Sequence, residues 1–136
     1  MGEVVQKRQV VSVRSSQDVL NVRQIARLWA VELGFGLVNQ TKLVTATSEL
    51  ARNMVNFASD GEVRLETLEA DGRRGLRLTF EDQGPGIPDV ELALKDGYST
   101  GGGLGLGLGG ARRLVDEFEI VTRVAEGTRV TITSWK

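Results

Sequence analysis

The sequence contains no cysteine and no histidine among its 136 residues. Without cysteine, the chain has no disulfide bond, no thiol nucleophile and no zinc–thiolate site. Without histidine, Ser-His-Asp catalysis, the usual zinc enzymes and a histidine phosphoacceptor are all excluded. Whatever chemistry the protein performs must therefore use carboxylates, amides, hydroxyls, backbone groups or a bound metal ion.

An excess of charge of one sign and long apolar segments are also lacking. Lysine and arginine total 17 and aspartate and glutamate total 18, which gives a formal net charge of -1. This balance offers no electrostatic basis for binding nucleic acid or an anionic membrane. No stretch approaches the roughly 20 apolar residues of a membrane span, and the N-terminal segment lacks the apolar core of a signal peptide. We expect a cytoplasmic protein with a single domain over residues 1–136.

The pattern of apolar residues predicts strands grouped in pairs. The expected strands are Arg8–Arg14, Val63–Ala70, Leu76–Asp82, Phe118–Val124 and Thr128–Trp135, with a hairpin turn at residues 71–74. The first expected helix ends near Gly34 and the second spans Asn39–Ala58. A short helical turn is expected at Glu91–Leu94, and a last helix covers Ala111–Phe118 and begins inside the glycine-rich segment before it. A doubly wound sheet would alternate strand and helix throughout. We instead predict an α/β (α+β) two-layer sandwich, in which helices cover one face of a mostly antiparallel mixed sheet.

Glu49 and Asn53, in the segment SELARN, lie four residues apart and therefore share one face of the second helix. That face is offset by one residue from Leu50 and Met54, so it borders the core and can face a cleft. A carboxylate there can orient or deprotonate a hydroxyl group, and an amide oxygen is a hard ligand suited to magnesium. A solvated polar stripe explains the same two residues, so the pair alone does not establish a site.

The segment EDQGPGIPD places Asp82 at the end of an apolar strand, just before a loop that contains Gly84 and Gly86. A carboxylate in that position can accept a hydrogen bond from an exocyclic amine such as that of adenine. The glycines let the backbone and a ligand approach closely, while Pro85 and Pro88 stiffen the loop. An ordinary turn at the end of a strand is the alternative explanation.

Glycine is concentrated in the segment TGGGLGLGLGG, residues 100–110. Ten of the 17 glycines lie within residues 84–110, which suggests either a flexible linker or a phosphate cradle. The linker explanation is weakened by Leu104, Leu106 and Leu108, because apolar residues at this spacing favour burial of one side of the segment. Backbone N–H groups at the start of the following helix would then be available to an anion. We therefore favour the cradle.

Two common phosphate-binding motifs do not explain the tract. The chain contains no G-x-x-x-x-G-K-[ST], so it is not a P-loop protein. A G-x-G-x-x-G pattern does occur at Gly105, Gly107 and Gly110. The dinucleotide motif also requires a preceding strand and an acidic residue about 20 positions later. Here a loop precedes the pattern and residues 128–133 contain no acid, so an oxidoreductase is disfavoured.

Four segments together resemble, in order, the motifs of the GHKL superfamily, which includes gyrase, Hsp90, histidine kinases and MutL. ELARN (residues 49–53) resembles its asparagine box and DQGPGIP (82–88) its first glycine box. GGGLGLGL (101–108) resembles its second glycine box, and EGTRVTI (126–132) resembles its last motif. The superfamily has the Bergerat ATP-binding fold, an α/β sandwich with the nucleotide between helices and sheet, which agrees with the predicted layout.

The resemblance implies a role for each matching residue. Glu49 would be the catalytic general base and Asn53 the magnesium ligand, while Asp82 would bind the adenine amine. Residues 89–103 would form a mobile lid over ATP. The implied nucleotide-binding residues are Asn53, Asp82, Gly84, Gly86, Gly103, Leu104, Gly105, Gly107 and Thr128.

Within the superfamily the chain is most similar to the RsbT-type switch kinases of bacterial stressosome partner-switching modules. Histidine kinases need a phosphoacceptor histidine, and this sequence has no histidine. The topoisomerase, chaperone and mismatch-repair members need further domains, which 136 residues do not supply. The resemblance implies a Mg2+- and ATP-dependent serine/threonine kinase with STAS-domain substrates. It also implies a regulator phosphatase of the PP2C type as a binding partner. From the charge balance we expect no nucleic acid or membrane partner. An anti-sigma factor or nucleotide-dependent adaptor with little catalysis would use the same ATP site, so that alternative stays open.

Overall fold

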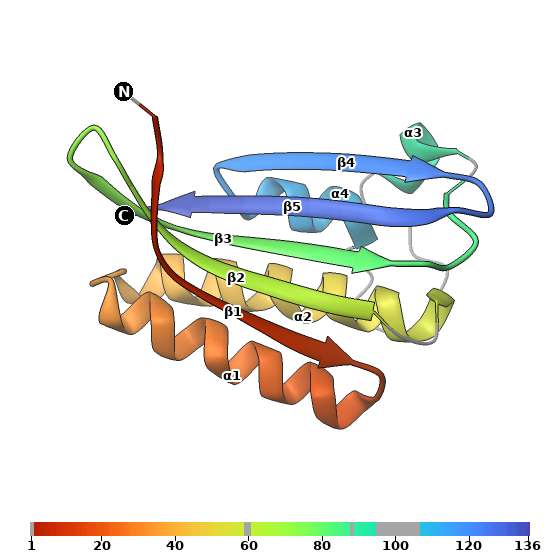
Figure 1. The fold of residues 1–136 in the computed structure, drawn as a ribbon, viewed down its shortest axis with the longest axis horizontal. Coiled ribbons are helices and arrows are strands. Elements are labelled where there is room, and N and C mark those ends of the chain that lie inside the picture. Colours follow the sequence, from red (N-terminus) through yellow and green to blue (C-terminus); the bar gives the residue numbers. More distant parts are fainter. Residues whose placement is uncertain (1, 59–60, 88, 95–106) are drawn as a thin grey trace.

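The computed structural model describes residues 2–58, 61–87, 89–94 and 107–136. Along the chain it has the elements β1 (Val4–Val13), α1 (Ser16–Glu32), α2 (Leu37–Ala58), β2 (Gly61–Ala70), β3 (Arg73–Asp82), α3 (Val90–Ala93), α4 (Gly107–Arg113), β4 (Glu117–Arg123) and β5 (Gly127–Trp135) (Figure 1). The strands and helices therefore occur in the predicted order.

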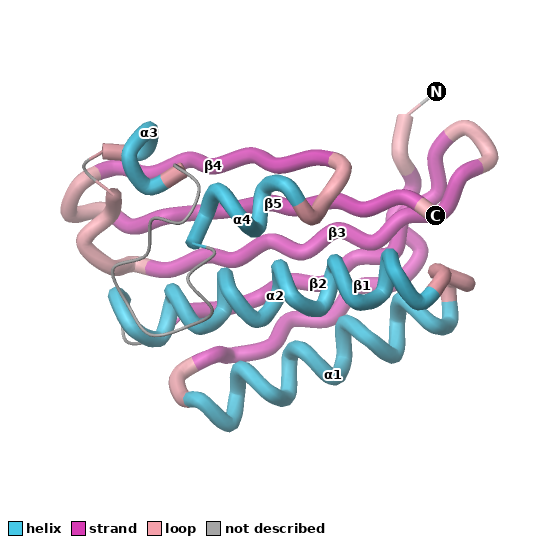
Figure 2. Tube along the Cα trace, turned by 180° about the vertical axis from the view of Figure 1, so that it is seen from behind, coloured by secondary structure: helices cyan, strands magenta, loops and turns pink. Residues whose placement is uncertain are grey.

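The strands form one sheet in the order β1-β2-β3-β5-β4. Each neighbouring pair in that order is antiparallel, so the described strands contain no parallel pairing and the sheet is not mixed. The sheet is built from two hairpins, β2–β3 and β4–β5, which meet where β3 pairs with β5. Figure 2 shows α1, α2 and α4 on the same face of this sheet. The predicted two-layer sandwich is confirmed.

The hydrophobic core lies between the sheet and the helices. Alternate residues of β3, namely Leu76, Leu78 and Phe80, point toward the helices and are at most 2% exposed. They pack in the same core as Leu50 and Met54 of α2. Full burial of one such side chain stabilises the fold by about 1.5–3 kcal/mol. This packing of β3 against α2 fixes the position of the residues beside it.

Local signals set the ends of α1. The Ser15 hydroxyl caps its N-terminus by accepting a hydrogen bond from the Asp18 backbone N–H at 3.2 Å. At the other end Gly34 has φ +87°, a left-handed conformation that glycine adopts without strain. The Phe35 N–H then donates to the Ala30 carbonyl at 2.9 Å, which closes the helix end. The predicted end of the helix near Gly34 is confirmed.

The hairpin turn between β2 and β3 is tighter than the sequence indicated. Asp71 and Gly72 have φ of 52° and 78°, and Ala70 pairs with Arg73 across them. Positive φ at both central residues is the signature of a two-residue turn matched to the twist of the strands. As a result β3 begins at Arg73, and the prediction that it begins at Leu76 was wrong.

The helix that follows the glycine tract begins inside the tract, as predicted, but it is shorter than expected. It ends at Arg113. The prediction of helix through Phe118 was wrong because the Asp116 N–H donates to the Thr133 carbonyl at 3.0 Å, which commits the chain to the sheet. Phe118 consequently lies in β4, where it pairs with Ile132 of β5.

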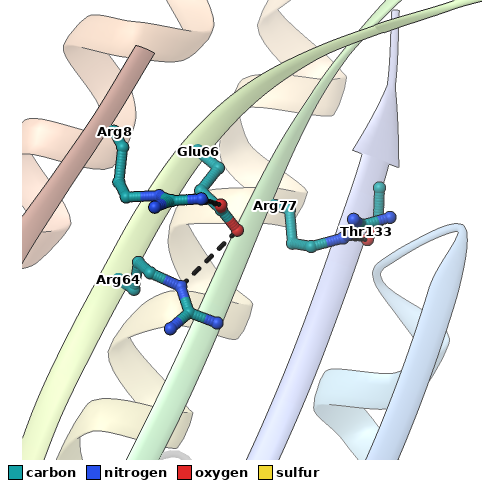
Figure 3. A network of polar contacts seen from close by, with 5 residues as sticks. All are labelled: Arg8, Arg64, Glu66, Arg77 and Thr133. Atoms are coloured by element: carbon teal, nitrogen blue, oxygen red, sulfur yellow. Dashed lines mark hydrogen bonds and ion pairs between the residues drawn. The ribbon is translucent and has the colours of Figure 1, made fainter. Parts of the chain in front are cut away.

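The sheet face opposite the helices carries a polar network (Figure 3). Glu66 is 6% exposed, and its Oε2 lies 2.8 Å from Nη2 of Arg8. Arg64 reaches the other oxygen of Glu66 at 3.6 Å. Nearby, Nε of Arg77 donates to the Thr133 hydroxyl at 3.0 Å. This face is thus held by ion pairs and hydrogen bonds.

Among the described residues, no helix is both long and apolar enough to cross a bilayer.

Candidate functional site

A pocket lies between α2 and one end of the sheet, where α3 and α4 also contribute to its walls. It is lined by Leu50, Asn53, Met54, Phe57, Phe80, Asp82, Ile87, Ala93, Gly107, Leu108, Thr128 and Val130. Four of the predicted nucleotide-binding residues, Asn53, Asp82, Gly107 and Thr128, therefore meet in it. A mostly apolar pocket with a few convergent polar groups is typical of a small-molecule site.

Asp82 and Thr128 form a polar pair at the sheet end of the pocket. They stand directly opposite each other in the pairing of β3 with β5. Asp82 continues the inward-facing series of Leu78 and Phe80, which is why a carboxylate reaches a largely apolar pocket. Its Oδ1 accepts a hydrogen bond from the Gly84 N–H at 2.9 Å, which orients the side chain. The pair can recognise a polar edge of a flat, apolar ligand.

Asn53 brings an amide into the pocket from α2. Its side chain is half-buried and lies one helical turn after Glu49. The described residues include no group of three or more Asp, Glu, His or Cys side chains able to hold a metal ion. A magnesium ion here would therefore take few protein ligands and rely on phosphate and water, which is the coordination that Mg2+ usually accepts. The amide of Asn53 fits that requirement.

Glu49 lies behind the pocket wall. The residue is 1% exposed, and its Oε1 accepts a hydrogen bond from the Gly107 N–H at 3.3 Å. Its other oxygen lies 3.3 Å from Nη1 of Arg52. Gly107 lines the pocket and Glu49 does not, so the backbone of Gly107 lies between the carboxylate and the cavity. Of the predicted pair on α2, only Asn53 reaches the cavity directly.

The glycines of the DQGPGIP segment make close contacts within the protein. A Cβ atom on Gly84 would lie 2.6 Å from Cβ of Ala58, at the end of α2. Gly86 has φ +78°, and a Cβ there would lie 2.3 Å from the Arg123 carbonyl oxygen. Neither glycine lines the pocket. Their predicted contact with the nucleotide remains a prediction. In the structure they let the loop pack on α2 and on the β4–β5 turn.

Several predicted residues lie outside the described part of the chain. These are Gly103, Leu104 and Gly105, together with most of the proposed lid at residues 89–103. The described start of that segment holds α3, whose N-terminus is capped by Oδ1 of Asp89 accepting from the Leu92 N–H at 3.0 Å. Leu108 is 7% exposed, so the prediction that the interspersed leucines are buried is confirmed for that residue.

Sequence reasoning missed the apolar lining residues Phe57 and Ile87, and it missed Thr122 behind the pocket wall. The Thr122 hydroxyl lies 2.8 Å from that of Thr128. The alternation of apolar and polar residues in FEIVTRV was the available signal, because it places Thr122 on the same face of β4 as Phe118 and Ile120.

Comparisons with known proteins identify the family of the chain. The sequence profile of the histidine kinase-, DNA gyrase B-, and HSP90-like ATPases matches residues 38–136. The serine/threonine-protein kinase RsbT of Bacillus subtilis (strain 168) is 45% identical over 125 residues, which cover 92% of this chain and 94% of that protein.

Solved structures share the fold. The RsbU and RsbW domains of a Mycobacterium tuberculosis protein match 96% of this chain with a TM-score of 0.65 and 22% identity. This chain spans 33% of that longer one. The mycobacterial sensor histidine kinase MprB matches 95% of this chain, and 97% of its own, with a TM-score of 0.57 and 18% identity. The chain therefore belongs to the family of histidine kinase-, DNA gyrase B- and HSP90-like ATPases and, within it, to the serine/threonine-protein kinases related to RsbT.

Proposed function

We propose that this kinase uses Mg2+ and ATP to phosphorylate a serine or threonine of a STAS-domain protein in a stress-signalling partner switch. The observation that carries the proposal is the meeting of Asn53, Asp82, Gly107 and Thr128 in one apolar pocket. We further propose that the chain acts as a single cytoplasmic kinase domain. By binding, it would also activate a PP2C-type regulator phosphatase, the partner that the similarity to RsbT-type switch kinases implies.

Each residue has a proposed task in the transfer. The adenine would lie between the apolar walls, with its amine donating to the Asp82 carboxylate and Thr128 beside it. Asn53 would hold magnesium, which neutralises phosphate charge during phosphoryl transfer. The backbone of Gly107 would face the phosphates at the start of α4. Glu49, next to Gly107, would accept the proton of the substrate hydroxyl after exchanging its present contacts.

Transfer of phosphate from ATP labelled at its γ-position tests the function. The protein is mixed with Mg2+, labelled ATP and a STAS-domain protein encoded near it, and the product is analysed for phosphoserine and phosphothreonine. We expect label on one of these hydroxyl groups, and none when EDTA removes magnesium. Tight binding of ATP and a sigma factor without any transfer would instead identify an adaptor and reject the kinase.

Replacement of Asp82 by asparagine should weaken ATP binding by about 10- to 100-fold, since a hydrogen bond to a charged group contributes about 1.5–3 kcal/mol. Asparagine keeps an oxygen for the Gly84 N–H but presents an amide NH2 to the adenine amine. Calorimetry with ADP measures the loss. Glu81→Gln is the matched control, because Glu81 is adjacent, exposed and absent from the pocket lining. Equal affinities for wild type and Asp82→Asn would remove Asp82 from adenine recognition.

A further inference from the structure

Thr122, near the end of β4, connects two residues that line the nucleotide pocket with Gly127, the first residue of β5, through one hydroxyl group. The Ile87 backbone N–H donates to its Oγ1 at 2.9 Å. Its Oγ1 lies 3.2 Å from the Gly127 carbonyl oxygen, to which it donates, and 2.8 Å from the hydroxyl of Thr128. Ile87 and Thr128 line the pocket, whereas Thr122 stands behind them. The residue is half-buried and faces the helical side of the sheet.

The hydrogen-bonding capacity of this hydroxyl group is fully used. A threonine hydroxyl has one proton to donate and two lone pairs that accept. If Thr122 donates to Gly127, its two lone pairs accept from the Ile87 N–H and from the Thr128 O–H. This assignment satisfies all three contacts at once. The opposite orientation, in which Thr122 donates to Thr128, gives up the bond to the Gly127 carbonyl.

The assignment decides what Thr128 offers to a ligand. Since its proton is directed at Thr122, Thr128 presents lone pairs to the pocket, beside the carboxylate of Asp82. Two acceptors side by side favour a ligand edge that carries a donor, such as an exocyclic amine or a water molecule bound to the base. They disfavour a carbonyl oxygen at the same place, because two acceptors that face each other make no hydrogen bond.

The neighbouring backbone leaves this arrangement little room to shift. Gly127 has φ +112°, and a Cβ atom there would lie 2.1 Å from the Asp82 carbonyl oxygen. The Ala125 N–H donates to the Pro85 carbonyl at 2.7 Å. This is a second hydrogen bond, beside that of Ile87 to Thr122, between the loop after β3 (residues 83–87, the glycine loop) and the β4–β5 region. Thr122 therefore links the glycine loop, through Ile87, to the start of β5, through Gly127, and Gly127 packs directly against the Asp82 backbone.

We propose that Thr122 is a positioning residue of the nucleotide site, which holds Ile87 and Gly127 together and keeps Thr128 as a hydrogen-bond acceptor toward the base. This inference rests on the proposed function, because it deepens the description of the same pocket. It assigns to Thr122 part of the selection of adenine over a base that carries a carbonyl group in place of the amine.

Substitutions that differ by the hydroxyl group test the proposal. Thr122→Val keeps the β-branched shape, and Thr122→Ser keeps the hydroxyl. Calorimetry gives the dissociation constants for ADP and for inosine diphosphate, in which a carbonyl replaces the amine. We expect Thr122→Val to bind ADP about three- to tenfold more weakly, the effect of one lost hydrogen bond. The preference for ADP over inosine diphosphate should narrow, because the freed Thr128 hydroxyl can then donate to a carbonyl. Thr122→Ser should match wild type in both measurements.

Thr133→Val is the matched control, because it removes a buried hydroxyl that bonds Arg77 on the opposite face of the sheet. It should leave both the ADP affinity and the base preference unchanged. In turnover assays, Thr122→Val should raise KM for ATP with little change in kcat, a split that general destabilisation would not produce.

The proposal is overturned if Thr122→Val retains wild-type affinity and base preference, or if Thr122→Ser is as impaired as Thr122→Val. Should the valine variant fail to fold, the comparison of Thr122→Ala with Thr122→Ser isolates the same hydroxyl group, and equal base preference in those two variants overturns it equally. A wild-type protein that binds no ADP would overturn the proposed function, and this assignment with it.

Discussion

Replacement of Asn53 by alanine is expected to abolish Mg2+-dependent phosphoryl transfer while the protein stays folded. Asn53 is half-buried and lines the pocket, and the described residues provide no cluster of three metal-binding side chains to take over its role. Loss of a metal ion that neutralises phosphate charge costs several kcal/mol of transition-state stabilisation, so the rate should fall by at least about 10³-fold. Alanine is the best helix former, which protects α2.

Asn56→Ala provides the control for this experiment. Asn56 lies on the same helix, is exposed and does not line the pocket, so its loss should change neither transfer nor nucleotide binding. Transfer is measured with labelled ATP over a magnesium titration, and folding is checked by thermal unfolding. If Asn53→Ala transfers phosphate at the wild-type rate at low magnesium, Asn53 is not the metal ligand.

Replacement of Glu49 by glutamine should leave ATP binding nearly intact and slow phosphoryl transfer by about 10²- to 10⁴-fold, the usual contribution of a general base. Glutamine has the same shape and retains an oxygen that can accept from the Gly107 N–H, so the wall of the pocket should keep its position. It has no basic carboxylate with which to receive the proton of the substrate hydroxyl. Single-turnover kinetics with a STAS-domain substrate separates the chemical step from binding.

A second buried glutamate makes the comparison specific. Glu66 is 6% exposed and pairs with Arg8 at 2.8 Å, but it lies on the sheet face opposite the helices (Figure 3). Glu66→Gln therefore reports what the loss of a buried, arginine-paired carboxylate does to the fold alone. We expect it to leave the rate of transfer unchanged. A wild-type rate in Glu49→Gln, or an equal loss of ATP binding and transfer, would exclude Glu49 as the base.

Most of the fold could be predicted because local signals and the final structure agree. Ser15 and Gly34 delimit α1 as their side-chain and backbone chemistry requires, and the apolar pattern identified the antiparallel pair β2 and β3. The errors lie where long-range pairing decides. Asp116 leaves the helical pattern because Thr133, which is distant in sequence, accepts its backbone N–H. No pattern within the segment after the glycine tract contains that information.

The site was predicted less completely than the fold. Asp82, Asn53 and Thr128 belong to recognisable motifs, and they do line one pocket. The burial of Glu49 could not be foreseen, since helical spacing fixes a face but not what covers it, and here Gly107 does. Thr122 lies in no motif, and its role depends on the tertiary contact between the glycine loop and the β4–β5 turn.

The meeting of two hairpins along β3 and β5 has a consequence for the energetics of the whole molecule. Asp82 belongs to one hairpin and Thr128 to the other, and the two residues face each other at the end of their shared boundary. A base bound by both Asp82 and Thr128 would connect the two hairpins across that boundary. Because a ligand that binds only the folded state stabilises it by mass action, nucleotide supply and resistance of the sheet to opening would be linked.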